Sequence, residues 1–140
     1  MKTLVFISVV VCTLILGSVS WQSTAATEAQ KRKAVTTFDN PVLVQGVVLQ
    51  GKYLFVHDDV AMNRGDACTY IYKGEAEVSE NLVTSFHCIH VERAKAKNFI
   101  LRTRETSPGM QELLEFQFTG ETGAHAVPRS VTTATVPLAN

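Results

Sequence analysis

Short runs of β-prone residues, each closed by a turn signal, constrain the fold of this 140-residue chain more than any other feature. Several runs alternate between apolar and polar residues with the period of two that is typical of a strand. No amphipathic pattern longer than two helical turns stands between them. The sequence therefore predicts an all-β fold, a single small sandwich or barrel of about six to seven mainly antiparallel strands. The expected strands lie at residues 42–49, 52–57, 68–72, 81–92, 99–104, 113–118 and 124–127.

The first two of these runs predict a hairpin. Its turn is expected at Gln50-Gly51, because glycine adopts positive φ without steric cost. Within residues 53–57 large side chains occupy both faces of the strand, with Tyr53 and Phe55 on one face and Leu54 and Val56 on the other. A strand of this kind is covered on both sides, which favours a two-layer architecture.

The amino terminus has the pattern of a secretory signal peptide. Lys2 supplies a positive start, the run from Leu4 to Leu16 is almost wholly apolar, and small polar residues follow it. The apolar run is shorter than the roughly 17 to 25 residues that a membrane-spanning helix needs, so the pattern favours a cleaved signal over a retained anchor. We expect residues 1–25 to be removed and the protein to be exported to a periplasmic or extracellular location.

Three further segments are expected in the mature chain, whose length of about 115 residues suits one domain. Residues 26–40 are polar and lack an apolar period, so they predict a flexible leader. Residues 41–127 contain the β-prone runs and form the sandwich-like domain. Residues 128–140 contain few large apolar side chains and predict a disordered tail.

The charge balance excludes some classes of partner. The chain has 13 basic and 13 acidic side chains, and signal cleavage removes only Lys2 from this count. A chain without excess charge produces no long-range field that attracts nucleic acid or an anionic membrane. We therefore expect no nucleic-acid partner and no membrane association after signal cleavage; the expected partner is an unidentified protein or small molecule.

Two cysteines remain after Cys12 leaves with the signal peptide, and in an exported domain such a pair indicates a disulfide. If the strands at 68–72 and 81–92 form an antiparallel hairpin, a register in which opposed residue numbers sum to about 156 places Cys68 opposite Cys88. The same register places Tyr70 opposite Phe86, which adds an aromatic cross-strand contact. The sequence thus predicts a Cys68–Cys88 disulfide across the sheet.

Free buried thiols are one alternative to the disulfide, and metal binding is the other. Cys88 and His90 are two residues apart on a strand and share one face, Cys68 lies opposite them in the favoured register, and His57 ends a neighbouring strand. Thiolate and imidazole ligands of this kind suit zinc or copper. Oxidation of the cysteines would remove two of the four ligands, so the disulfide and the metal site are mutually exclusive.

Calcium binding and catalysis have weaker support in the sequence than the disulfide or the zinc or copper site. Asp58, Asp59, Asn63 and Asp66 offer oxygen ligands in one loop, but their spacing differs from that of the EF-hand, and turns favour the same residue types. No motif of an enzyme family is present, which favours a non-catalytic protein. The expected function is therefore binding or structural, without a cofactor. The alternative is a small metal-binding or thiol-redox protein that uses His57, Cys68, Cys88 and His90.

Four stretches carry a resemblance to known proteins: GKYLFVHDD, GDACTYIY, VTSFHCIHVERAKA and ELLEFQFTGETGAHAVP. Together they resemble small exported bacterial β proteins with no assigned function, over most of residues 51–128. The resemblance implies an exported single domain and supplies no catalytic residue.

Overall fold

The computed structural model describes residues 31–129 and consists almost wholly of β-strands. The predicted all-β class is confirmed, with eight strands where about six to seven were expected. The elements are β1 (Lys31–Val44), β2 (Val47–Asp58), α1 (Asp59–Asn63), β3 (Thr69–Lys73), a 3-10 turn (Ser79–Asn81), β4 (Leu82–Phe86), β5 (Ile89–Glu92), β6 (Ile100–Ser107), β7 (Met110–Gln117) and β8 (Gly123–Ala126). Neither helix of the described residues is long and apolar enough to cross a membrane.

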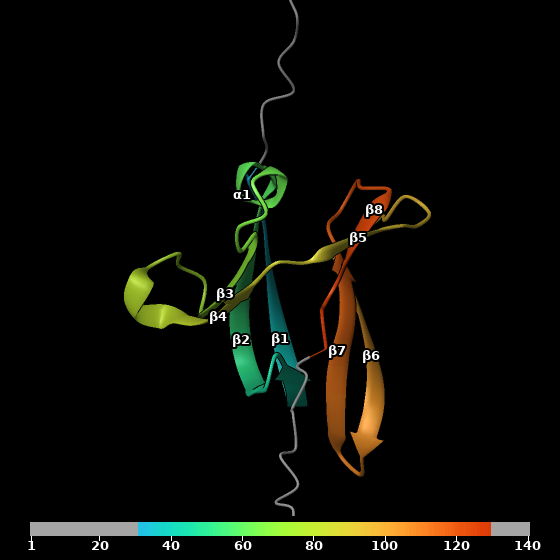
Figure 1. Cartoon of the computed structure of the whole chain (residues 1–140). Helices are drawn as coiled ribbons and strands as arrows, with labels where there is room; N and C mark the ends of the chain where they lie inside the picture. Colours follow the sequence, from blue (N-terminus) through green and yellow to red (C-terminus); the bar gives the residue numbers. More distant parts are fainter. Residues whose placement is uncertain (1–30, 130–140) are drawn as a thin grey trace, which may run out of the picture.

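The strands form one curled, half-barrel sheet in the order β4-β3-β2-β1-β7-β8-β5, and β6 pairs with β7. Figure 1 shows β1–β4 as one arm and β5–β8 as a second arm, with the chain between β4 and β5 crossing from one to the other. The only pairing between β1 and β7 is parallel and short, Val42 with Gln111 and Leu43 with Glu112, while the other pairings are antiparallel. At the end that carries α1 the two arms are therefore joined by side chains.

The first hairpin forms as expected, but its turn was predicted at the wrong place. The turn is Gln45-Gly46, with φ of 49° and 80°, and Val44 pairs with Val47. Two consecutive positive φ angles are typical of the two-residue turn that matches the twist of a hairpin. Gly51 lies inside β2 instead, opposite Phe38, next to the point where the β1–β2 register shifts.

The prediction of a flexible leader at residues 26–40 is wrong from Lys31 onward. Residues 31–40 belong to β1 and pair with the far half of β2, from Lys31 opposite Asp58 to Phe38 opposite Gly51. Their polar character reflects a strand with many half-exposed positions. The predicted signal peptide at 1–25 and nearly all of the predicted tail at 128–140 lie outside the described residues.

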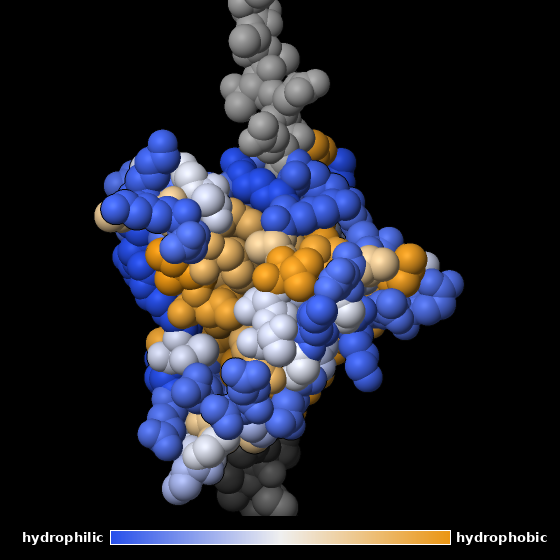
Figure 2. Space-filling view, turned by 180° about the vertical axis from the view of Figure 1, so that it is seen from behind, coloured by the Kyte–Doolittle hydropathy of each residue, from blue (hydrophilic) through white to orange (hydrophobic). Residues whose placement is uncertain are grey.

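The main core fills the space between the two arms. Phe55 of β2 and Phe116 of β7 are fully buried, with ring centroids 5.4 Å apart, and Phe99 packs against both. A smaller apolar cluster lies on the outer face of β2 and β3, where the loop before β4 folds back and Glu77 pairs with Lys31 and Lys33 of β1. Figure 2 shows an apolar area in the middle of the rear face, bordered by hydrophilic side chains. The core thus spans the sheet on both faces, as the pattern of residues 53–57 indicated.

The predicted pairing of the cysteine-bearing strands is wrong by one residue. Tyr70 lies opposite Ser85, and Thr69 lies opposite Phe86, so Cys68 is not in ladder register with Cys88. The structure also differs from the predicted disulfide, because Cys68 and Cys88 are both free cysteines. The long run at 81–92 is two strands: β4 ends at Phe86, and β5 pairs with β8 in the second arm. Cys88 occupies the short crossing between them.

Candidate metal centre

Three buried side chains converge at the α1 end of the half-barrel: His57 of β2, Cys88 of the β4–β5 crossing and His125 of β8. Their ligand atoms all lie within 4.8 Å of one another. Cys88 Sγ is 3.7 Å from His57 Nδ1 and 3.5 Å from His125 Nδ1. The two imidazole rings are neighbours, with centroids 4.0 Å apart and planes tilted by 41°. None of the three residues is more than 3% exposed.

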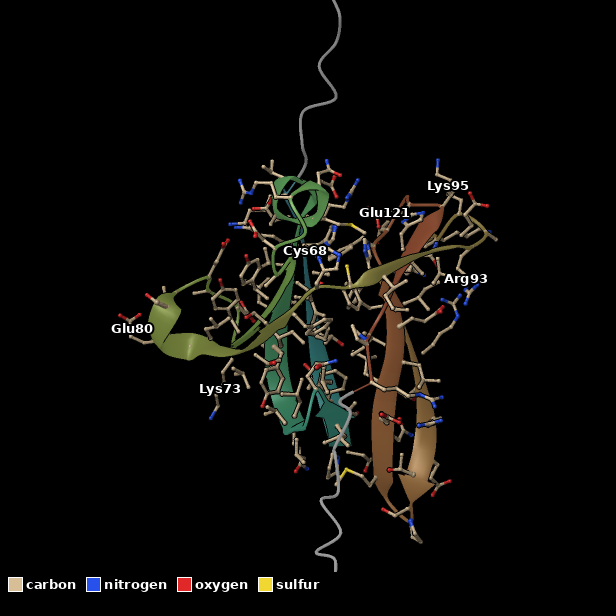
Figure 3. The ribbon with its side chains drawn as sticks, viewed as in Figure 1. Cys68, Lys73, Glu80, Arg93, Lys95 and Glu121 are labelled. Atoms are coloured by element: carbon tan, nitrogen blue, oxygen red, sulfur yellow. The ribbon has the colours of Figure 1, made fainter. Side chains whose placement is uncertain are left out.

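A second sulfur lies beside this trio. Cys68 Sγ is 3.1 Å from Cys88 Sγ and accepts a hydrogen bond from the Cys88 N–H at 3.2 Å. Its own backbone is fixed, because its N–H donates to the Phe86 carbonyl and its carbonyl accepts from the Asp58 N–H. Figure 3 shows Cys68 on the first arm just below α1, with Glu121 at the same end of the second arm. The cluster therefore holds two sulfurs and two imidazoles.

Each histidine has a carboxylate on its outer nitrogen. Glu121, in the β7–β8 turn, lies 3.2 Å from His125 Nε2 in hydrogen-bonding geometry. Asp59, the first residue of α1, lies 3.0 Å from His57 Nε2, although these two atoms are not aligned as a hydrogen bond. With Nε2 facing a carboxylate, Nδ1 of each ring faces Cys88. Carboxylates in this position are typical of metal-ligating histidines, whose orientation and basicity they set.

Arg32 joins the two carboxylates. Its Nη1 donates to both carboxylate oxygens of Asp59, at 2.8 and 2.9 Å, and its Nε pairs with Glu121. Arg32 lies directly opposite His57 in the β1–β2 ladder, so both side chains point to the same face of the sheet. One guanidinium thus connects the first arm to the β7–β8 turn of the second, and we call the trio Arg32, Asp59 and Glu121 the arginine clamp.

Burial sets the protonation of the cluster. The pKa of His57 is lowered to about 4, mainly by burial and in smaller part by repulsion from the neighbouring His125. Burial also raises the pKa of the Cys88 thiol to about 12, with a further contribution from its hydrogen bond with Cys68. Near neutral pH His57 is therefore uncharged, the form that ligates a metal, and Cys88 retains its proton unless a cation displaces it.

The distances can be compared with those of a tetrahedral site. Zinc–sulfur and zinc–nitrogen bonds of about 2.3 and 2.05 Å place neighbouring sulfur and nitrogen ligands about 3.6 Å apart, and neighbouring sulfurs about 3.8 Å apart. The observed sulfur–nitrogen distances of 3.5 and 3.7 Å match the first value. The sulfur–sulfur distance of 3.1 Å lies between this geometry and the roughly 2.05 Å of a disulfide bond. A small movement of Cys68 would produce either state.

A cavity of about 470 Å³ adjoins the cluster on the side of the arginine clamp. Arg32, Asp59, Glu121 and His125 are among its lining residues, so the outer edge of the cluster borders this cavity. His90, Met62 and residues 119–123 complete the lining. His57, Cys68 and Cys88 are not among the lining residues.

The structure brings together three of the four residues that the sequence suggested as metal ligands. His57, Cys68 and Cys88 belong to the cluster, whereas His90 is exposed and lies against Gly123. Sequence reasoning missed His125, which lies directly opposite His90 in the β5–β8 ladder. The pairing of those two strands, 89–92 with 123–126, was the missing signal.

The oxygen ligands of the 58–67 loop serve structural roles. Asp58 caps α1 by accepting a hydrogen bond from the Ala61 N–H, and Asp66 pairs with Arg64. Asp59 belongs to the clamp. The loop is thus a short helix with its cap, and the three aspartates that the calcium hypothesis named have protein partners.

Comparison with protein-family models, with curated proteins and with solved structures gave no match.

Proposed function

We propose that this protein is a small exported β domain that binds one soft or borderline metal cation, zinc or monovalent copper, at the α1 end of its half-barrel. The observation that carries the proposal is the position of both Nδ1 atoms, 3.5 and 3.7 Å from a single buried thiol. Imidazole and thiolate are the ligands that these cations prefer. His57, Cys88 and His125 are the ligands, and Cys68 supplies the second sulfur.

The carboxylates support this assignment over an ordinary polar core. A buried histidine needs hydrogen-bond partners, but it does not need its other nitrogen to point at a thiol. Here Asp59 and Glu121 face the outer nitrogens, and Arg32 holds both carboxylates. This orients both free nitrogens toward one point, the arrangement that metal sites use to position their ligands.

The buried position of the site favours storage, transport or structural stabilisation over catalysis. Catalytic zinc sites keep an open coordination position for water or substrate. In this cluster the three ligands are buried, and Cys68 lies beside Cys88 as the candidate fourth ligand that would close the coordination sphere.

A Cys68–Cys88 disulfide is the competing state of the same residues. In the chain-entropy model, closing a loop of about 20 residues stabilises the domain by roughly 3 kcal/mol. The thiol contact at 3.1 Å supports both states, because it needs little movement to become a bond or to admit a cation. We therefore propose that the dithiol form binds metal and that the disulfide form does not.

The test compares metal binding by the reduced and the oxidised protein. Reduced wild-type protein should bind a single cation of zinc or monovalent copper, while oxidised protein and the variants Cys88→Ala and His125→Gln should bind far more weakly. His87→Ala is the matched control, since His87 is exposed and its Nδ1 contacts only the Asp66 carbonyl. Equal binding by the wild type and Cys88→Ala, or no binding by the reduced wild type, would refute the proposal.

A further inference from the structure

The cavity beside the metal centre contains two potential metal ligands that the centre does not use. His90 of β5 and Met62 of α1 both line it, together with the outer edge of His125. They come from different arms of the half-barrel and meet at the same opening. A buried centre needs an entry path, and this cavity borders the cluster directly because His125 lines it.

His90 is held on the cavity wall by a close contact with a glycine. A Cβ added at Gly123 would lie 2.3 Å from His90 Cε1, so only the missing side chain at that position lets the ring lie there. Directly opposed residues in a ladder point to the same face, and His90 opposes His125. Among residues 31–129 the His90 ring has no hydrogen-bond partner, so its nitrogens are available to a ligand.

Met62 supplies a thioether on the other side. Its side chain is half-buried, packs against the main core and lines the same cavity. Thioether sulfur is a soft ligand that suits monovalent copper, whereas the usual zinc ligands are thiolate, imidazole and carboxylate. A methionine at the entrance therefore distinguishes between the two cations.

We propose that His90 and Met62 form an outer site that takes up monovalent copper and passes it to the buried centre, so that copper is the physiological cation. This inference rests on the proposed function. The transfer is a ligand exchange without a change of oxidation state: copper leaves the imidazole and thioether, bonds to the Cys88 sulfur, and the thiol proton leaves to solvent. His125, which borders the cavity with one edge and faces Cys88 with the other, lies between the two sites.

The experiment follows the transfer of monovalent copper from a coloured chelator complex to the reduced, full-length mature protein under anaerobic conditions. Wild-type protein, Met62→Leu and His90→Ala are compared, and loading with zinc is measured in parallel. Each variant should load copper about tenfold more slowly, the factor that corresponds to one lost contact of about 1.4 kcal/mol. The final amount of bound copper should be unchanged, because the inner ligands remain.

Two controls match these variants. Met110→Leu changes another half-buried methionine, at the start of β7, and His87→Ala changes another exposed histidine. Both should load copper at the wild-type rate.

Three results would overturn the inference. They are equal loading rates in all variants, a lower final amount of bound copper in His90→Ala, which would make His90 an inner ligand, and a wild type that binds zinc but not copper. The last result would leave the proposed function intact. Failure of the reduced wild type to bind either cation would refute the proposed function itself and the inference with it.

Discussion

The middle and the α1 end of the half-barrel are equally buried but differ in chemistry. Phe55 and Phe116 in the middle are 0% exposed, and at the end His57 and Cys88 are 0% and 1% exposed. The aromatic rings need only close neighbours, because burial of apolar surface is favourable in itself. The polar groups need partners, because burial without them is unfavourable. Equal burial therefore stabilises the fold in one region and creates a demand for a ligand in the other.

The pKa shifts in the end region show the effect of burying these polar groups. Burial holds the His57 pKa far below its ordinary value and the Cys88 pKa far above it, so both groups stay uncharged. His57 Nε2 also lacks an aligned hydrogen-bond partner in the part of the chain that the structure describes. A bound cation would engage the sulfur and both inner nitrogens at once. The four predictions below test this difference, from the largest expected effect to the smallest.

Phe116→Ala tests the middle region. Removing a fully buried ring that contacts Phe55 should lower the free energy of unfolding by about 3–5 kcal/mol, because the cavity refills only partly. Urea unfolding of the metal-free protein measures the loss. A loss below about 1 kcal/mol would show that the core is less tightly packed than described.

Metal-linked stability tests the end region. At a free cation concentration of 100 times Kd, binding to the folded state should raise the free energy of unfolding by about 2.7 kcal/mol. The same cation should leave the stability of Cys88→Ala unchanged, since that variant lacks the central sulfur ligand. Thermal unfolding of both proteins with and without cation makes the comparison, and equal stabilisation of the two would place the site elsewhere.

Mild acid should lower the free energy of unfolding of the metal-free protein because of the shifted pKa of His57. A group whose pKa falls from about 6.5 in the unfolded chain to about 4 in the folded protein stabilises the fold above the unfolded value, and this stability is lost as pH falls toward 4. Between pH 7 and pH 5 the loss from His57 should be about 2 kcal/mol. The free energy of unfolding of the wild type and of His57→Phe, measured at both pH values, isolates the contribution of His57. An identical pH dependence in the two proteins would contradict the assignment of this loss to His57.

Arg32→Met tests the arginine clamp. Loss of the guanidinium frees both carboxylates, so metal affinity should fall about tenfold, as expected for groups that orient ligands. Arg104→Met is the matched control, because Arg104 pairs with Glu112 on an exposed surface away from the cluster. A surface pair of this kind contributes about 1 kcal/mol or less to stability. Equal metal affinity in the two variants would show that the arginine clamp does not support metal binding.

The sequence predicted the middle of the molecule better than its end. Alternation in residues 113–118 and large side chains on both faces of residues 53–57 report burial directly, because each strand carries its own pattern. The hairpin turn was harder to find, since the glycine at 51 resembles a turn residue as much as the glycine at 46 does. The residues before 41 were misjudged because a half-exposed strand has little apolar periodicity.

The candidate site depends on pairings that no local pattern encodes. His57, Cys68 and Cys88 were recognised by residue type, but the register that joined the cysteines was off by one. They meet because β4 ends at Phe86 and the chain then crosses to the second arm. His125 lies 37 residues from Cys88, and only the β5–β8 pairing brings it near. The candidate ligands could thus be recognised from their residue types, whereas the long-range strand pairing could not be predicted from the sequence.

X-ray absorption at the metal edge of the reduced, cation-loaded protein tests the central claim most directly. The account predicts sulfur neighbours at about 2.3 Å together with imidazole nitrogen at about 2.0 Å. The sulfur signal should weaken or disappear in Cys88→Ala. A wild-type spectrum with only oxygen or nitrogen neighbours would contradict a centre built on Cys88, His57 and His125.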